Sequence, residues 1–343
     1  MPVGIRETAE HRMDRPLLTL KAVVKHYQHK PDLIDRTLMA VNLKVPPDVV
    51  HAVNGVDLSV YPGEILGIVG ESGCGKSTIG RLMTGLEAPD SGTILYNDKP
   101  VQQNGEPANL AVQMVFQDAA ATLNPRRAIG SQLTEAPLAH GLIRKHEARA
   151  FLGALLARVG LDVEAADRYP HQFSGGQRQR LNIARALAIK PKLIVCDESV
   201  ASLDVSIQAQ ILNLILDLRK HEGLAVVFIS HDLSVVNRIA DRVAVLYLGR
   251  VVEYGRARDV FKQGLHPYTQ ALNGNKLTLE ASLDDLALLP GEPPSPVNLP
   301  GGCPFHPRCR HTFAKCSVSV PPPLPQDADH WATCFRLLGE DDA

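Results

Sequence analysis

The chain has 343 residues, with 36 basic and 37 acidic side chains and a formal net charge of −1. This length allows a large core and predicts about two domains of roughly 150 residues each. The balanced charge excludes the strongly positive field with which proteins attract nucleic-acid backbones, so nucleic acid is not an expected partner. No apolar run reaches the roughly 18 residues that span a bilayer, and the N-terminus lacks the apolar core of a secretory signal, so we expect a cytoplasmic protein.

Apolar, strand-like runs alternate with helical patterns from Leu17 to about Ala257. The runs are Leu18 to Val24, Glu64 to Val69, Ala111 to Phe116, Leu193 to Cys196, Ala225 to Ile229 and Arg242 to Leu248. This alternation is typical of an α/β domain with a largely parallel sheet. Residues 28–50 contain several prolines and little periodicity, which predicts an inserted surface loop after the first strand.

A glycine-rich run over residues 70–78, GESGCGKST, follows a strand pattern and precedes a helical pattern from Ile79 to Leu86. Glycines let successive N–H groups converge on phosphate oxygens, and the helix presents its positive end there. In such a loop Lys76 neutralises the β- and γ-phosphates and Ser77 places its hydroxyl on Mg²⁺. A turn without a ligand is the alternative, and the strand and helix on either side disfavour it. The nucleotide-binding residues predicted here are Gly70, Ser72, Gly73, Cys74, Gly75, Lys76, Ser77 and Thr78.

Between Gln117 and Lys190 the pattern becomes mainly helical, with Ile129 to His140 and Lys145 to Val159 as the clearest helices. We therefore expect a helical subdomain, at about 118–190, inserted in the α/β core.

A second anion site is predicted where Ser174, Gly175, Gly176 and Gln177 open a helix over Arg178 to Ile189. A hydroxyl and glycine N–H groups at a helix N-terminus favour negative charge. A helix cap followed by a glycine turn has the same sequence pattern. Two phosphate-type sites in one chain are nevertheless hard to explain by capping alone.

Two adjacent carboxylates, Asp197 and Glu198, end the apolar run that starts at Leu193. Asp197 is placed to hold Mg²⁺ through its water shell, and Glu198 is placed to polarise an attacking water. A strand that ends in solvated acids would be the better interpretation if this segment stood alone.

In this order the motifs resemble those of the nucleotide-binding subunits of ATP-binding cassette (ABC) transporters, with Ser174 to Gln177 as the signature motif. The resemblance implies a P-loop NTPase core that binds ATP with Mg²⁺. In that family two such domains sandwich ATP, and each signature faces the phosphate loop of the other domain. The single copy of each motif therefore implies a dimer.

The resemblance assigns further positions. Gln117 matches the Q-loop glutamine, which contacts Mg²⁺ and water and relays the nucleotide state to the membrane subunit. Ser202-Leu203-Asp204 matches the D-loop that crosses the dimer interface, with Asp204 assigned to the nucleotide site. His231 matches the switch histidine at the γ-phosphate, and Tyr27 matches the aromatic residue that stacks on adenine. Local packing is the alternative for Tyr27, because stacking needs a specific geometry.

Several segments narrow the resemblance to the ATPases of dipeptide and oligopeptide importers. They are residues 70–78, 123–126 (LNPR), 230–236 (SHDLSVV) and 266–272 (HPYTQAL), and the similarity runs from Leu17 to about Leu338. It implies a nucleotide-binding domain over 17–263 and a loop-rich, metal-binding C-terminal extension over 264–343. Ser199 departs from the family's usual proline after the catalytic carboxylate, and residues 118–122 also differ from the common sequence.

The C-terminal extension carries four cysteines, spaced C-x5-C-x6-C-x17-C, in a proline-rich segment: Cys303, Cys309, Cys316 and Cys334. In a reducing compartment such a group indicates metal binding before disulfides. The spacing is not the C-x2-C pairing of common zinc modules, and four thiolates can bind a 4Fe-4S cluster or Zn²⁺. The resemblance implies the cluster, since some members of this subfamily carry one there, with Zn²⁺ as the alternative. Its expected role is to stabilise the extension.

These expectations combine into an ATPase that powers the import of small peptides. Glu198 and His231 support in-line attack of water on the γ-phosphate, Gln117 completes the catalytic set, and Ser77, Gln117 and Asp197 hold Mg²⁺. The resemblance implies a second, related ATPase subunit, two membrane permease subunits and an extracytoplasmic solute-binding protein. A heterodimer is favoured over a homodimer, peripheral to the cytoplasmic face of the membrane.

Other functions remain open from the sequence. The solute contacts belong to the permease and the binding protein, so nickel, opines or sugars are alternative solutes. A soluble ABC ATPase acting on DNA or ribosomes, and a redox protein with a degenerate ATPase, are alternatives from other classes. A soluble ABC ATPase typically carries two cassettes or a long coiled coil, and neither appears in this sequence. The intact Lys76, Asp197, Glu198 and His231 argue against a redox protein with a degenerate ATPase.

Overall fold

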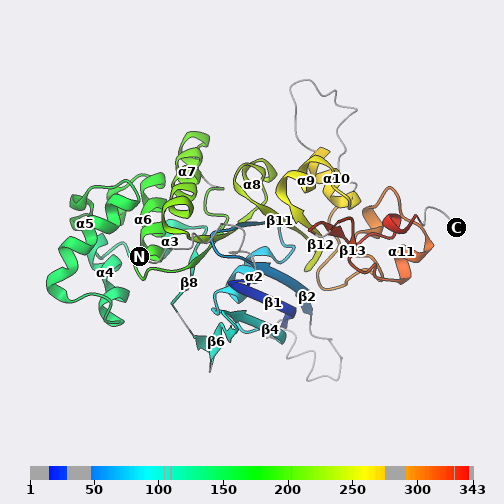
Figure 1. The fold of residues 1–343 in the computed structure, drawn as a ribbon, viewed down its shortest axis with the longest axis horizontal. Helices are drawn as coiled ribbons and strands as arrows, with labels where there is room; N and C mark the ends of the chain where they lie inside the picture. The colour runs from blue at the N-terminus through cyan, green and yellow to red at the C-terminus, as the bar shows by residue number, and fades with distance from the viewer. Residues whose placement is uncertain are drawn as a thin grey trace, which may run out of the picture.

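The structure is a computed structural model that describes residues 15–28, 48–103, 105–108, 110–201, 203–274, 291–327 and 329–339. A mainly parallel sheet runs through the middle of the molecule, with helices against it and a smaller antiparallel sheet beside it (Figure 1). Helices α4 (Ile129–Ala139), α5 (Ala148–Arg158) and α6 (Gly175–Leu187) form one end of the long axis. Helix α11 (Ala314–Val318), in the C-terminal extension, lies at the other end (Figure 1).

The main sheet of the described residues has eight strands in the order β13-β14-β12-β11-β3-β10-β9-β8. The central strands β11, β3, β10, β9 and β8 are parallel, and β12, β14 and β13 extend one edge in antiparallel pairing. Their bounds are β3 Ile65–Val69, β8 Val112–Val115, β9 Leu193–Asp197, β10 Ala225–Ser230, β11 Arg242–Tyr247, β12 Arg250–Arg256, β13 Leu324–Pro325 and β14 Trp331–Ala332. Every residue of β3, β9 and β10 is buried, as expected for strands covered on both faces. The predicted α/β architecture is confirmed.

A second sheet, which the sequence pattern does not predict, is antiparallel. Its order is β2-β1-β4-β5, with β1 Leu18–Gln28, β2 Val49–Val60, β4 Ser91–Tyr96 and β5 Lys99–Pro100, and β6 Gln102–Gln103 pairs separately with β7 Glu106–Pro107. The predicted loop over 28–50 is shorter than expected, because Gln28 pairs with Val49 and Tyr27 pairs with Val50. Its residues 29–47 lie outside the described part of the chain.

The helices agree with the sequence prediction in position and differ at their ends. Helix α6 begins at Gly175, earlier than predicted, because Ser174 caps it, and the predicted start of α5 is a short 3-10 turn at Lys145–Glu147. The remaining helices are α2 Lys76–Met83, α3 Ala119–Thr122, α7 Val205–Glu222, α8 Leu233–Ile239, α9 Ala257–Lys262 and α10 Pro267–Gly274, with 3-10 turns at Val163–Asp167, Pro170–Gln172, His306–Arg308 and Phe335–Leu338. Helices α3 to α6 lie inside the range 118–190, whose exact limits stay a prediction.

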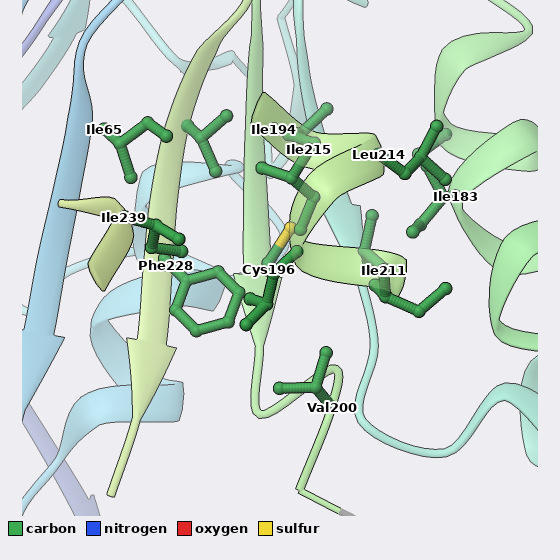
Figure 2. Close-up of a cluster of buried hydrophobic side chains, with 14 of the residues drawn as sticks. Ile65, Ile183, Ile194, Cys196, Val200, Ile211, Leu214, Ile215, Phe228 and Ile239 are labelled. Carbon is green, nitrogen blue, oxygen red and sulfur yellow. The ribbon is translucent and has the colours of Figure 1, made fainter. Parts of the chain in front are cut away.

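One buried apolar cluster connects the helical end of the molecule to the C-terminal extension. Figure 2 shows its centre, where Cys196 of β9 and Phe228 of β10 face Ile211 and Ile215 of α7. The same cluster continues to Cys303 and Phe305 of the extension. The extension therefore packs on the core that also supports the strands leading to the site.

Val195 of β9 belongs to a second buried apolar cluster, which includes Ile79 and Leu82 of α2, and it tests how far packing supports the strands that lead to the site. It is 0% exposed and packs behind α2, whereas Val205 is 82% exposed. Val195→Ala should lower the free energy of unfolding by about 2 kcal/mol, through lost burial and a cavity. The same change at Val205 should cost less than about 0.5 kcal/mol. Urea unfolding of the full chain measures both, and equal effects would contradict the assignment of Val195 to the core.

Candidate functional site

The loop 70–78 connects β3 to α2 and has a backbone that its glycines permit. Gly73 and Gly75 have φ values of 78° and 104°, in a region that favours glycine. A Cβ atom on Gly75 would lie 2.1 Å from the carbonyl oxygen of Ala52, so the loop also needs glycine there for space. The predicted strand, glycine-rich turn and helix are all present.

The Lys76 ammonium lies against the backbone at the start of this loop. It is buried and donates hydrogen bonds to the carbonyl oxygens of Gly70 and Glu71, at 2.9 Å each. Its Nζ atom is 3.9 Å from Oε1 of Glu198. The loop thus holds the cation next to the N–H groups that can bind a phosphate.

Ser77 and Asp197 form the oxygen-donor pair predicted for Mg²⁺. The Ser77 hydroxyl donates to Oδ1 of Asp197 at 3.0 Å. Burial raises the pKa of Asp197, and the neighbouring Glu198 charge adds to this effect, while the Ser77 bond opposes it. A hydroxyl beside a carboxylate is a hard oxygen donor set that suits Mg²⁺, and a bound cation would favour the ionised acid.

Glu198 is the point on which the predicted catalytic residues converge. Gln117 donates from Nε2 to Oε2 of Glu198 at 3.1 Å, and Nδ1 of His231 lies 3.3 Å from Oε1. Together with Lys76, these side chains come from separate segments of the chain. The sequence predicted each of them individually, and the structure brings them together.

The backbone of Glu198 is in the left-handed region, with φ at 43°. For a residue with a Cβ this conformation costs roughly 1–2 kcal/mol. The next residue is Ser199, which is buried, and serine does not impose the restriction that proline places on the residue before it. The departure from the family pattern thus leaves Glu198 freer to adopt this conformation.

Tyr27 lies at the end of β1, beside the helix that follows the phosphate loop. Its hydroxyl donates to Glu87, and the Thr78 side chain is a second partner. Burial raises the pKa of Tyr27, and the bond to Glu87 raises it further. The ring is near the nucleotide loop, as an adenine-stacking residue must be, and stacking itself stays a prediction.

The signature residues make a capping box at the start of α6. The Gln177 N–H donates to Oγ of Ser174 at 3.3 Å, and the Ser174 N–H donates to Oε1 of Gln177 at 3.1 Å. A Cβ atom on Gly176 would lie 2.5 Å from Cγ2 of Ile207, so this glycine lets α6 pack on α7. Ser174 and Gln177 thus bond to each other and not to the phosphate loop of the same chain.

The D-loop precedes α7, whose N-terminal cap is Asp204. Asp204 makes no side-chain capping bond. Ser202, the first residue of the predicted D-loop, lies outside the described residues. The assignment of Asp204 to the nucleotide site stays a prediction.

Asn182 is a residue that the sequence did not single out. Its Nδ2 atom donates to the carbonyl oxygen of Phe116 at 2.9 Å, directly before Gln117. Asp118 accepts bonds from the Ala120 and Ala121 N–H groups and starts the short helix α3. The signature helix is thereby tied to the Q-loop. One asparagine inside a helix carries no sequence signal for such a contact.

The four cysteines of the extension are free thiols that line one cavity of about 20 Å³. Burial raises the pKa of Cys303 to about 11, and the neighbouring thiols add to this effect. Within the described ranges, however, no group of three or more His, Cys, Asp or Glu side chains is arranged to hold a metal ion. The predicted metal-binding extension and its iron–sulfur cluster therefore gain no support from the side-chain positions.

A membrane-spanning helix is likewise absent from the described ranges, where no helix combines the length and apolarity that crossing a bilayer requires.

Comparison with known proteins places this geometry in a family. A family model described as ABC transporter matches residues 53–201, and one for the C-terminal region of oligopeptide/dipeptide transporters matches residues 252–316. The chain is 42% identical over 337 residues to the dipeptide transport ATP-binding protein DppF of Escherichia coli K12, covering 96% of this chain and 97% of that protein. It is 44% identical over 301 residues to the oligopeptide transport ATP-binding protein OppF of the same organism, covering 85% and 90%.

Solved structures give the same answer for the fold. The dimeric structure of MJ0796, a bacterial ABC transporter cassette, superposes with a TM-score of 0.59 at 28% identity, covering 70% of this chain and 99% of that one. CbiO1 of Clostridium perfringens, part of the ABC transporter complex cbiONQ, also gives a TM-score of 0.59, at 25% identity, covering 76% and 96%. The chain is therefore an ABC transporter ATPase and belongs to the family of ATP-binding subunits of dipeptide and oligopeptide transporters.

Proposed function

We propose that this chain hydrolyses ATP to drive the import of dipeptides or short oligopeptides through a membrane ABC transporter. The observation that carries the proposal is the contact of Lys76, Gln117 and His231 with Glu198, beside the Ser77–Asp197 pair. Peptides lead as the solute because the chain is similar over almost its whole length to DppF of Escherichia coli.

The chemistry follows from what these side chains can do. Lys76 exchanges its bonds with the Gly70 and Glu71 carbonyls for bonds with phosphate oxygens. Ser77 and Asp197 would hold Mg²⁺, which supplies charge neutralisation at the phosphates. Glu198 accepts a proton from the attacking water, while Gln117 and His231 hold its carboxylate in place.

The site needs a second subunit to be complete. The signature residues Ser174 to Gln177 are bonded among themselves, and Val205, next to Asp204 of the D-loop, is 82% exposed. A partner domain would place its own signature on the phosphate loop of this chain, and Ser174 would face the partner's nucleotide. We infer that the partner is a related ATPase, because peptide systems of this family commonly pair two different ones.

Coupling to the membrane would pass through the helical subdomain. Asn182 of α6 is bonded to the carbonyl oxygen just before Gln117, so a change at the γ-phosphate can move α6 through a short path. Two permease subunits and an extracytoplasmic solute-binding protein complete the proposed transporter. The chain itself would lie on the cytoplasmic face of the membrane.

Replacement of Glu198 with Gln tests the catalytic assignment. The amide keeps the shape of the side chain but cannot accept the proton, so kcat should fall at least about a hundredfold while affinity for Mg-ATP changes little. Phosphate release by the assembled transporter and nucleotide binding by the full chain measure the two quantities. Glu135→Gln, on an exposed ion pair with Arg127, is the matched control and should keep parental activity. Parental hydrolysis in the Glu198 variant would remove Glu198 from the mechanism.

We further propose that the four extension cysteines hold a 4Fe-4S cluster. The support is the donor set, because all four thiols line one cavity. Burial raises the pKa of the Cys303 thiol to about 11, so a metal that binds here must displace its proton.

The metal content of anaerobically purified protein tests this proposal. Iron and sulfide in equal amounts, with a broad visible absorption that bleaches on reduction, are the expected result. Cys309→Ser should lower the iron content severalfold, whereas Cys74→Ser, which alters a cysteine of the phosphate loop, should leave it unchanged. Stoichiometric zinc, or protein free of metal, would exclude the cluster.

A further inference from the structure

Glu71, the second residue of the phosphate loop, is bonded through all its polar groups. Its N–H donates to the hydroxyl of Tyr268 at 2.9 Å, and its carbonyl oxygen accepts from Lys76 at 2.9 Å. Its carboxylate accepts from both terminal nitrogens of Arg308, at 2.7 and 3.1 Å. Tyr268 and Arg308 belong to the C-terminal part of the chain, so that part holds the loop directly.

The pair between Arg308 and Glu71 is a partly buried, two-point ion pair. The Arg308 side chain is 5% exposed and that of Glu71 is 23% exposed, and the Tyr247 hydroxyl lies 3.4 Å from Arg308. Two parallel charge-assisted bonds fix orientation as well as distance. Because one partner is largely removed from water, loss of the other leaves a poorly solvated charge. This contact therefore differs from the exposed ion pairs elsewhere on the surface.

An aromatic cluster surrounds the two residues that contact Glu71, Tyr268 and Arg308. The Phe305 ring packs on Tyr247 and Tyr268, with ring centroids 5.3 Å apart in each case. The Tyr268 N–H donates to Nδ1 of His266, a histidine that burial keeps neutral by lowering its pKa to about 4. Phe305 and Arg308 stand in one short segment between Cys303 and Cys309. The segment that lines the cysteine cavity thus also delivers Arg308 to the loop.

A shift of Glu71 would also move its carbonyl oxygen, which contacts the Lys76 ammonium and the Cys74 N–H group. The Glu71 carbonyl is one of the two that hold the Lys76 ammonium, and it also accepts from the Cys74 N–H at 3.4 Å. The residues between Glu71 and Lys76 carry the N–H groups that face a phosphate. A loop held in one shape loses less conformational freedom when the ligand binds, and this favours affinity if that shape fits the ligand.

We propose that Arg308 and Tyr268 are positioning residues that hold the phosphate loop, through Glu71, in the shape that binds ATP. The C-terminal extension thereby acts on the nucleotide site of its own chain. This inference rests on the proposed role of residues 70–78 in binding phosphate.

The test is the affinity of the full-length chain for a nonhydrolysable ATP analogue with Mg²⁺, measured by titration calorimetry. Arg308→Gln should raise Kd about tenfold, because the Glu71 carboxylate loses both of its bonds. Tyr268→Phe, which keeps the packed ring and removes only the hydroxyl, should raise Kd about threefold. In the assembled transporter both variants should raise KM more than they lower kcat.

Arg256→Gln is the matched control. Arg256 pairs with Asp329, so it also joins the core to the extension, but through an exposed contact away from the phosphate loop. Its Kd should equal that of the parent. If Arg256→Gln weakens binding as much as Arg308→Gln, the effect comes from general loosening of the extension, and the proposal is wrong.

A double-mutant cycle separates positioning from folding. In a Glu71→Gln background, Arg308→Gln should cause little further loss of affinity, because its partner charge is already gone. Arg308→Lys should recover part of the affinity, since it restores the charge without the two-point contact. A full further loss in the Glu71→Gln background, or parental Kd values in both Arg308→Gln and Tyr268→Phe, would overturn the proposal.

Lys76→Ala distinguishes this inference from the one on which it rests. If Lys76→Ala keeps parental affinity, the loop does not bind phosphate and both inferences fail. If Lys76→Ala loses affinity while the Arg308 and Tyr268 variants do not, the phosphate loop stands and only the positioning role is excluded.

Discussion

The site depends on one constraint, which is that the parallel strands β3, β9 and β10 end at the same edge of the sheet. Val69 pairs with Ser230, and Ile229 pairs with Asp197, so the three strand ends are in register. The segments that follow them carry the phosphate loop, Glu198 and His231. Because these strands are buried on both faces, their ends cannot shift independently. The contacts of Lys76 and His231 with Glu198 follow from this register.

The conformation of Glu198 and the burial of Asp197 each cost free energy of folding, which the packing of the core must offset. Glu198 has a left-handed backbone, and Asp197 is a carboxylate whose pKa burial raises. Both features lie directly after β9, whose residues are all buried between β8 and β10. Strain and charge persist at such a position only where the surroundings leave the chain no easier conformation. The apolar cluster around Cys196 and Phe228 in Figure 2 provides that rigidity.

The sequence predicts the parts of the fold that obey local rules. The parallel strands are visible in the sequence as short apolar runs. Gly73 and Gly75 are visible because the phosphate loop needs positive φ values there, which glycine adopts readily. The antiparallel strands β2, β4 and β12 were missed because they mix buried with partly or fully exposed residues and so lack the continuous apolar runs of β3, β9 and β10. Asn182 and Arg308 were missed for a different reason. Their partners, Phe116 and Glu71, lie 66 and 237 residues away, and no local pattern encodes such contacts.

The extension and the catalytic core share buried polar and apolar contacts. Glu253 of β12, which is 0% exposed, accepts bonds from the N–H groups of Leu265 and His266 and contacts His330 beside β14. Cys303 and Phe305 belong to the main apolar cluster, and Arg308 continues from them to the phosphate loop. Linkage between two sites is reciprocal. If docking of the 303–309 segment strengthens ATP binding by some factor, then bound ATP strengthens that docking by the same factor. The same segment lines the cysteine cavity and contacts the phosphate loop through Arg308 and Glu71. The proposed linkage therefore extends from the nucleotide site to the cysteine cavity.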